Sequence, residues 1–257
     1  MGEVELKRVC HRFTSAASTY DRHASAQQQI CRRLLSLLRQ EHELDFERVL
    51  ELGCGSGGFT RLLLSEGRVG EWCLNDLCES WHPELSRLMS GTVWHWLPGN
   101  AEAMHFPGQY DLVVSANALQ WMHDLPGFVG RLADSVSPGG MLLFNLFSSR
   151  NLQEVRSLTS AGLEYLPARE IGRMLEEHFH VLQLKEEDII LHFSNPISVL
   201  RHLKYTGVTA TSSGVWTKGR QRQFCEDYLA RFSTPDGQVR LTYSPIYIVA
   251  TKMKVNE

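Results

Sequence analysis

The segment from Val49 to Gly58 constrains the fold of this 257-residue chain more than any other segment. It reads Val-Leu-Glu-Leu-Gly-Cys-Gly-Ser-Gly-Gly, an apolar run that passes directly into a glycine-rich turn and then into a helix-forming stretch. Glycine permits a tight turn and lets backbone N–H groups approach a ligand closely. The N-terminus of the following helix adds unpaired donors and a partial positive charge. The segment therefore predicts a strand–turn–helix unit of an α/β protein, with a ligand bound at the turn.

The rest of the chain shows the alternation that such a protein requires. Short apolar runs alternate with helical segments as far as Arg150, which predicts a mostly parallel, doubly wound sheet with helices on both faces. Ser137-Pro138-Gly139-Gly140 is expected to be a turn between a helix and a strand. The expected strands are Val49–Leu52, Glu71–Leu74, Val93–Leu97, Tyr110–Ser115 and Met141–Phe147, and the expected helices are Gly58–Ser65, Trp81–Met89 and Pro126–Val136.

The two ends of the chain are expected to add a cap and a lid to this core. Residues 1–40 are predicted to be helical, with Ile30, Leu34, Leu35 and Leu38 on one face. An insertion between late strands of such a sheet often becomes a lid near the ligand. We expect a single domain over residues 1–257, divided into a cap (1–40), a ligand-binding core (48–150), a lid insertion (195–238) and a closing strand (240–252). The later elements expected are a helix at Pro167–His178, one or two strands in Phe179–Phe193, two helices in Asn195–Gln238 split by a loop at Thr209–Gly214, and a strand at Leu241–Lys252.

Charge and composition exclude several classes of protein. The chain has 26 Lys+Arg against 29 Asp+Glu, a net charge of −3, which argues against bulk electrostatic binding of nucleic acid or an anionic membrane. No apolar run approaches the roughly 18 residues that predict a membrane span. The first residues lack the features of a secretory signal. The six cysteines have no CxxC spacing and the histidines no HExxH pattern, so we expect reduced thiols, no metal and a cytoplasmic location.

Two carboxylates narrow the choice of ligand. The spacing Gly53-x-Gly55-x-x-Gly58 also fits a dinucleotide fingerprint, so the glycines alone leave a nicotinamide cofactor and other adenosine ligands open. Glu51 stands two residues before the first glycine, where a dinucleotide-binding strand is usually apolar, and suits a ligand with an ammonium group. Asp76 ends the next expected strand, where an acid can bind both ribose hydroxyls. S-adenosylmethionine has all the groups that this pattern favours.

From Arg48 to Phe147 the sequence resembles class I S-adenosylmethionine-dependent methyltransferases. The resemblance implies that Glu51 and the glycine loop hold the methionine end of this methyl donor, Asp76 the ribose and Leu77 an adenine face. Many members have Asp where this chain has Asn100, whose amide can accept the same hydrogen bond without charge. The implied donor-binding residues are Glu51, Gly53, Gly55, Gly57, Asp76, Leu77, Asn100, Ala101 and Ser115.

Other segments point to the methyl acceptor. Gln120 and Trp121 follow the fourth expected strand at the edge where ligands bind, so we expect them to line an acceptor pocket. Further matching segments extend over nearly the whole chain, and with them it is similar to the BioC family, the malonyl-acyl-carrier-protein O-methyltransferases of biotin synthesis. These segments are Phe13–Asp21, Glu51–Gly57, Leu119–Trp121, Pro167–Leu175, Leu200–Gly207 and Leu241–Tyr243. The resemblance implies methylation of the free carboxylate of a malonyl thioester, on acyl-carrier protein or CoA, to an ester that primes pimeloyl synthesis.

The expected chemistry needs alignment more than proton transfer. A malonyl carboxylate, with a pKa of about 4, is already ionised at pH 7, so no general base is required. The protein must align donor and acceptor and exclude water. Arg201 is the first candidate to hold the non-reacting oxygen, with Lys204 and Arg12 as alternatives. By analogy with caps in related enzymes, Tyr20 is expected to close over the donor at the methyl-transfer centre.

The sequence alone does not decide between several functions, nor which face of the protein would bind a carrier protein. The alternatives are another small-molecule O- or C-methyltransferase, a non-catalytic S-adenosylmethionine-binding protein and, more distantly, a nicotinamide oxidoreductase. An acidic carrier protein would need a local basic face on this slightly acidic chain. The candidates are Arg201, Lys204, Lys218, Arg220 and Arg222, or Lys7, Arg8 and Arg12.

Overall fold

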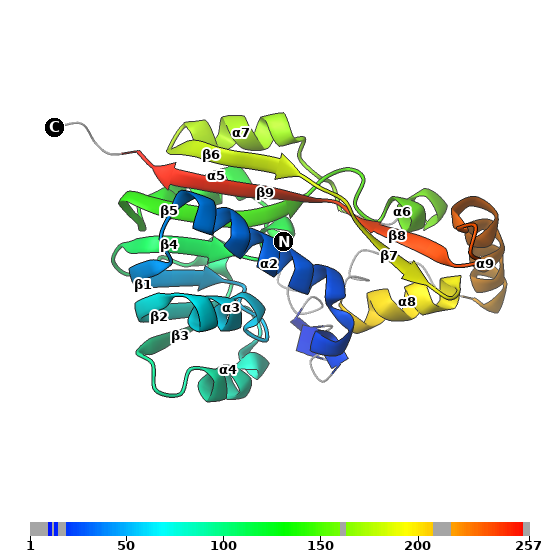
Figure 1. Ribbon diagram of the computed structural model, residues 1–257, viewed down its shortest axis with the longest axis horizontal. Coiled ribbons are helices and arrows are strands. Elements are labelled where there is room, and N and C mark those ends of the chain that lie inside the picture. The colour runs from blue at the N-terminus through cyan, green and yellow to red at the C-terminus, as the bar shows by residue number, and fades with distance from the viewer. Residues whose placement is uncertain (1–9, 12, 15–18, 160–162, 208–216, 254–257) are drawn as a thin grey trace.

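A seven-stranded sheet forms the centre of the computed structural model, which describes residues 10–11, 13–14, 19–159, 163–207 and 217–253. The first five strands are parallel, and β9 runs antiparallel between β5 and β6 (Figure 1). This confirms the mostly parallel sheet expected from the sequence. The strands, in spatial order, are β3 (Trp94–Pro98), β2 (Arg68–Asp76), β1 (Asp45–Leu52), β4 (Tyr110–Ser115), β5 (Val136–Phe147), β9 (Pro245–Lys252) and β6 (Phe179–Glu186).

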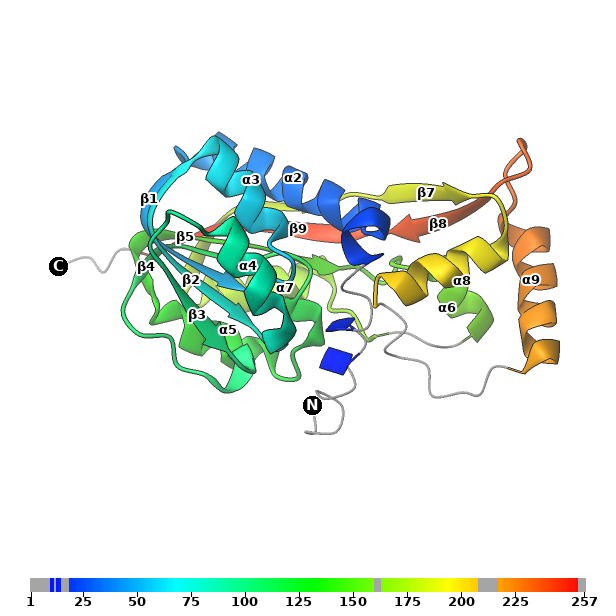
Figure 2. The ribbon, with the colours of Figure 1, turned by 90° about the horizontal axis from the view of Figure 1, so that it is seen from below.

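Helices cover both faces of this sheet and create two apolar cores. Helices α2 (Ser25–Glu41) and α3 (Gly58–Glu66) cover one face, and α5 (Leu125–Ala133) and α7 (Ala168–Glu176) cover the other (Figure 2). Helix α2 buries its apolar face in the first core, and α7 contributes Ile171 to the second. A short helix, α4 (His82–Leu88), follows the 3-10 turn η1 (Glu79–Trp81). None of the described helices is both long and apolar enough to cross a membrane.

The single closing strand expected at Leu241–Lys252 is wrong, because the chain changes sheets at Ser244. Strand β8 (Val239–Tyr243) pairs with β7 (Ile189–Phe193) in a separate two-stranded sheet, whereas β9 continues in the main sheet. Both halves are buried. Burial therefore gives no sign of the break, and the Ser244-Pro245 pair is the signal that the sequence offers.

An additional helix, α6 (Gln153–Thr159), was not expected and packs against β8. The fully buried carboxylate of Glu154 accepts hydrogen bonds from the backbone N–H of Thr242 (3.0 Å) and from its hydroxyl (2.7 Å). This pairing fixes α6 on the small sheet.

The described part of the expected lid contains two helices, α8 (Pro196–Tyr205) and α9 (Lys218–Phe232), and the loop expected at Thr209–Gly214 lies outside the described residues. Together with α6, β7 and β8 they form an outer module that extends from one end of the main sheet (Figure 1). Val199 and Tyr228 of this module join the same apolar core as α2. The structure beyond the main sheet is thus larger than the expected insertion.

The turn expected at Ser137–Gly140 is also corrected, because β5 already begins at Val136. The start of this strand is irregular: the pairing of β4 with β5 shifts between Tyr110 and Leu112, and Gly139 has a φ of +80°. Proline and glycine signal this irregularity, but the strand continues through it. The preceding helix is correspondingly shorter than expected.

Candidate active site

A cavity of about 410 Å³ opens at the carboxyl ends of β1, β2 and β4. Strand β1 lies between β2 and β4 in the sheet, so the cavity is at the point where the strand order reverses, the usual ligand site of such sheets. Its volume lies within the range typical of small-molecule sites. Helix α2 and the preceding cap residues form one wall. The residues expected from the sequence that line it are Tyr20, Glu51, Gly53, Gly55, Asp76, Leu77, Asn100, Ala101 and Trp121.

The glycine loop adopts left-handed backbone angles that favour glycine. The φ values of Gly53, Gly55 and Gly57 are +65°, +53° and +78°. A Cβ on Gly53 would lie 2.3 Å from the Cβ of Ala118, whereas one on Gly55 would meet nothing within 4 Å. A Cβ on Gly57 would lie 2.6 Å from Leu88 in α4, and Gly57 does not line the cavity. Gly57 therefore lies on the side of the turn that packs against α4, away from the cavity.

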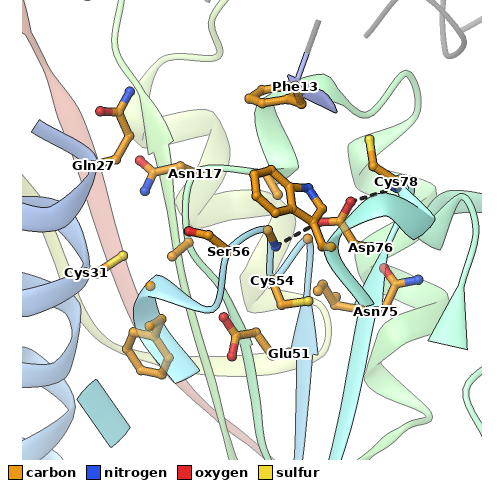
Figure 3. A pocket seen from close by; sticks show the side chains of 18 of the residues that line it. Phe13, Gln27, Cys31, Glu51, Cys54, Ser56, Asn75, Asp76, Cys78 and Asn117 are labelled. Atoms are coloured by element: carbon orange, nitrogen blue, oxygen red, sulfur yellow. Dashed lines mark hydrogen bonds between the residues drawn. The ribbon is translucent and has the colours of Figure 1, made fainter. Parts of the chain in front are cut away.

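Asp76 connects the glycine loop to the end of β2. Its Oδ2 accepts a hydrogen bond from Gly55 N and its Oδ1 one from Cys78 N, both at 2.8 Å (Figure 3). Burial raises the pKa of this carboxyl, and the backbone hydrogen bonds oppose that effect. Each carboxylate oxygen has a further lone pair. The side chain can thus hold the loop and accept hydroxyl hydrogen bonds at the same time.

Glu51 lies on the cavity floor and is 1% exposed. The Thr60 hydroxyl donates to its Oε2 at 2.7 Å. Burial nevertheless raises the pKa of Glu51 to about 8. A cationic group in the cavity would favour the ionised form and lower this pKa.

Aromatic rings close the cavity on the cap side. Tyr20 contacts Phe13 and Trp81 edge-on, with centroids 6.3 and 6.2 Å apart, and Phe13 contacts Trp121 at 6.1 Å. Burial raises the pKa of the Tyr20 hydroxyl further above neutrality, so it stays protonated. These rings give the wall a largely apolar surface.

A hydrogen bond that the sequence did not reveal attaches the cap to the glycine loop. The Ser56 hydroxyl donates to Asp21 Oδ1 at 2.7 Å. Both residues line the cavity. Tyr20 thus contributes an aromatic ring to the cavity wall, and the adjacent Asp21 accepts a hydrogen bond from the glycine loop.

Two late sequence motifs also meet beside the cavity wall. His202 of α8 and the Tyr243 hydroxyl of β8 form a buried hydrogen bond, with Nε2 and the hydroxyl oxygen 2.9 Å apart. Burial lowers the pKa of His202 to about 4, so the ring is neutral at pH 7. Gly207, with a φ of +72°, leaves room for the Phe13 ring, because a Cβ there would lie 3.0 Å from it. The segments Leu200–Gly207 and Leu241–Tyr243 therefore join the outer module to the cap.

Several residues expected in the site lie outside the cavity. Ser115 donates to Leu52 O at 2.9 Å and joins β4 to β1. Gln120 donates from Nε2 to Asn117 O at 2.7 Å. Arg201 and Lys204 are exposed on α8 and do not line the cavity. Lys7, Arg8 and Arg12 lie outside the described residues.

The cavity also includes polar residues that sequence reasoning missed. Gln27 and Arg32 come from α2, Arg61 from α3, and Asn117 from the loop after β4. Gln27 interrupts the apolar face of α2, which is the one signal that could have found it. Among the described residues, no three His, Cys, Asp or Glu side chains gather as metal ligands.

Comparison with solved structures defines the class of protein. A methyltransferase from Bacillus halodurans aligns with a TM-score of 0.64 at 17% identity, covering 86% of this chain and 99% of the other. Magnesium protoporphyrin IX methyltransferase from Synechocystis, solved with bound S-adenosylmethionine, aligns with a TM-score of 0.52 at 14% identity, over 88% and 79% of the two chains. The sequence family described as "Methyltransferase domain" matches residues 20–183. The fold and the position of the cavity define a class I methyltransferase.

Curated relatives narrow this class to one family. A malonyl-[acyl-carrier protein] O-methyltransferase from Porphyromonas gingivalis is 43% identical, with 96% of both chains aligned. A protein of the same name from Chlorobium luteolum is 41% identical over 98% of this chain and 97% of the relative. The chain belongs to the family of malonyl-[acyl-carrier protein] O-methyltransferases, which confirms the resemblance seen in the sequence.

Proposed function

We propose that this protein transfers the methyl group of S-adenosylmethionine to the free carboxylate of a malonyl group on acyl-carrier protein or CoA. The observation that carries this proposal is the 43% sequence identity, over nearly the full length, to a relative named for this reaction. The cavity of this chain has Glu51 and Asp76 in its lining and lies where the strand order of the sheet reverses. The resemblance to the family places the methyl ester product in pimeloyl and biotin synthesis. We further propose a cytoplasmic location and the division into cap, core and lid.

The described residues fit S-adenosylmethionine. The buried carboxylate of Glu51 suits the ammonium group, and Asp76 suits the ribose hydroxyls. The open space at Gly55 allows close approach to the backbone. Arg32 and Arg61 line the same cavity and suit the carboxylate of the methionine end. Residues suited to the adenine are Leu77, Asn100 and Ala101.

The reaction requires no proton transfer from the protein. When bound, S-adenosylmethionine supplies a methyl carbon on a positively charged sulfur. A carboxylate oxygen forms a bond to this carbon while the C–S bond breaks and its electron pair stays on sulfur. The products are an ester and a thioether. The Tyr20 hydroxyl, protonated at neutral pH, can donate a hydrogen bond near the transfer centre. The Phe13 and Trp121 rings exclude water from it.

Donor binding is expected to release a proton near pH 7. The carboxyl of Glu51 has a pKa of about 8 and is mostly protonated before binding, whereas an adjacent ammonium group favours its ionised form. Affinity should therefore rise with pH between 6 and 8, by up to about tenfold per pH unit. Calorimetry in buffers of different ionisation enthalpy measures the released proton.

The Glu51→Gln variant is the control for this linkage, because it keeps the shape of the side chain without its titration. It should bind the donor about tenfold more weakly, with most of the proton release lost. Binding of wild-type protein that is independent of both buffer and pH would contradict the role of Glu51.

The outer module is our proposed docking surface for the acidic carrier. Arg201 and Lys204 on α8, and Lys218 and Arg222 on α9, are exposed. The double change Arg201→Ala and Lys204→Ala should raise KM for malonyl-carrier protein about tenfold at low salt, because rim charges steer association. KM for malonyl-CoA should stay within about twofold.

A charge-matched control comes from the opposite part of the molecule. Arg87 on α4 and Arg173 on α7 are also exposed. Replacing both with alanine should leave the KM for malonyl-carrier protein and the KM for malonyl-CoA close to the wild-type values. An equal loss on carrier-bound and CoA-bound malonyl in the Arg201 and Lys204 variant would contradict docking. It would instead support the earlier prediction that Arg201 holds the malonyl carboxylate.

A panel of methyl acceptors tests the proposed function against its rivals. With labelled S-adenosylmethionine, label should enter malonyl thioesters as a base-labile ester and should not enter acetyl thioesters. Label on a quinone or a free carboxylic acid would favour another small-molecule methyltransferase. Donor binding without transfer to any acceptor would favour a non-catalytic protein.

A further inference from the structure

We propose that the side-chain carbonyl of Gln27 accepts a hydrogen bond from an amide N–H of the thioester arm that carries the malonyl group. This inference rests on the proposed function and names the part of the acceptor molecule that Gln27 recognises. The malonyl thioesters of CoA and of carrier protein share a pantetheine arm, in which an amide follows the sulfur after a two-carbon link. A contact with that amide would serve both acceptors alike.

The Gln27 carbonyl is a buried acceptor that lacks a donor. Gln27 lines the cavity and is 7% exposed, and its Oε1 has no hydrogen-bond partner among the described residues. Oδ1 of Asn117, in the loop after β4, is in the same state. Figure 3 shows the Asn117 carboxamide pointing toward α2, from which Gln27 projects. Buried carbonyl oxygens normally accept hydrogen bonds, so this part of the wall suits a ligand group that donates one.

The outer module determines which end of the Gln27 carboxamide is free. Its N–H end donates to the buried hydroxyl of Tyr243 on β8. The same hydroxyl lies 2.9 Å from Nε2 of His202 on α8 and is also hydrogen-bonded to Thr206. Because the nitrogen of the carboxamide is bound to Tyr243, the oxygen is the end left for a ligand. Tyr243 and His202 are therefore positioning residues for Gln27.

Gln27 lies on the acceptor side of the proposed transfer centre. One helical turn of α2, about 5.4 Å, separates it from Cys31, whose thiol is close enough to Glu51 to interact electrostatically. The Tyr20 hydroxyl interacts in the same way with Cys31 and with Tyr243. The cavity wall thus leads from Glu51, which suits the ammonium group of the donor, past Tyr20 to Gln27 beside the outer module.

The chemistry of the two ligands selects the amide of the arm. The ammonium group of S-adenosylmethionine suits the carboxylate of Glu51 better than a neutral carbonyl, and its ribose hydroxyls suit Asp76. The malonyl carboxylate and the thioester have only oxygen and sulfur acceptors, which a carbonyl oxygen would repel. The first N–H group of the acceptor molecule is therefore the amide beyond the sulfur. A carrier bound to the outer module would bring its arm to the end of the cavity where Gln27 lies.

Two synthetic acceptors that differ in a single group test this contact. The malonyl thioester of N-acetylcysteamine keeps the first amide of the arm, and its 2-acetoxyethyl analogue has an oxygen in place of that N–H. Wild-type protein should use the amide with about tenfold higher kcat/KM, because the analogue leaves Gln27 Oε1 without a donor. Gln27→Met should lower this preference to about twofold or less, and Tyr243→Phe, which lets the Gln27 amide turn, to about threefold.

Gln29→Met is the matched control, because Gln29 is an exposed amide on the same helix outside the cavity and should keep the wild-type preference. The dissociation constant for S-adenosylmethionine, measured by calorimetry, should stay within about threefold in every variant. A donor affinity that falls as much as kcat/KM in Gln27→Met would assign the carbonyl to the donor and overturn the inference. An unchanged preference in Gln27→Met would also overturn it.

The wild-type preference needs no variant, so it decides alone if the Gln27 and Tyr243 variants do not fold. Methylation of malonyl-CoA without a preference for the amide thioester, or without any turnover of it, would refute the contact and leave the proposed function standing. Failure to methylate both malonyl-CoA and malonyl-carrier protein would refute the proposed function, and the contact with it.

Discussion

Replacing Gly53 with alanine is expected to weaken S-adenosylmethionine binding by roughly 100-fold, or about 2.7 kcal/mol. The added Cβ would lie 2.3 Å from the Cβ of Ala118, at a φ of +65° that alanine rarely adopts. To relieve this contact, the glycine loop must move away from the loop that carries Asn117 and Ala118. Both loops line the cavity, so the shape of the cavity would change. Calorimetric titration with the donor measures the loss.

Gly91→Ala separates the steric effect from the backbone strain. Gly91 has a φ of +84°, but a Cβ there would meet nothing within 4 Å. This variant should lose about 1 kcal/mol of stability or less and bind the donor normally. Equal donor affinity in Gly53→Ala and wild-type protein would show that the loop is not a tight cradle.

Replacing Asp76 with alanine is expected to weaken donor binding by about 100- to 1,000-fold. The change removes the acceptors proposed for the ribose hydroxyls, and hydrogen bonds to charged groups contribute about 1.5–3 kcal/mol each. It also frees the N–H groups of Gly55 and Cys78, which hold the loop in place. Calorimetry again measures affinity, and thermal unfolding measures any change in stability.

Two further variants test whether the loss of affinity in Asp76→Ala comes from the missing carboxylate in the cavity. Asp76→Asn keeps one carbonyl acceptor and should fall between wild type and alanine. The carboxylate of Asp111, like that of Asp76, accepts hydrogen bonds from two backbone N–H groups, those of Glu47 and Arg48. These groups lie near the start of β1, at the other end of the strand from the cavity, so Asp111→Asn is the matched control. It should lower stability without changing donor affinity. A similar loss of affinity in Asp111→Asn and Asp76→Ala would contradict a direct role for Asp76.

The cavity wall at the ends of β1 and β2 could be predicted because it depends on local sequence. The strand that ends at Leu52, the glycine turn and the helix after it are consecutive, so their geometry follows from residue types at fixed spacing. The position of Asp76 on this wall follows for the same reason, since the end of a parallel strand adjacent to β1 must face the turn. Ser115 and Gly57 show the limit of this reasoning. They lie beside cavity-lining residues in sequence, but their side-chain positions face β1 and α4 instead.

The cavity wall formed by α2 and by the loop after β4 depends on contacts between distant segments, which one sequence does not reveal. Asn117 points into the cavity because Asn145 and Gln120 hold its peptide in a left-handed conformation. The charge of Arg201 and its place in the segment Leu200–Gly207 make it a candidate from the sequence. In the structure this segment buries His202 against Tyr243 and leaves Arg201 exposed.

The break between β8 and β9 has a weak signal in the sequence. Both strands are buried throughout most of their length, and the pair Ser244-Pro245 marks the boundary between them. The change of sheet follows from pairing partners, β7 for one strand and β5 and β6 for the other. Pairing partners of this kind are set by tertiary structure.

Intact mass spectrometry of malonyl-carrier protein, incubated with this protein and S-adenosylmethionine, measures the proposed methyl transfer itself. We predict that the carrier gains a single methyl group, that acetyl-carrier protein gains none, and that mild base releases the added methyl as methanol. An unmodified malonyl-carrier protein, under conditions where calorimetry shows the donor bound, would contradict it.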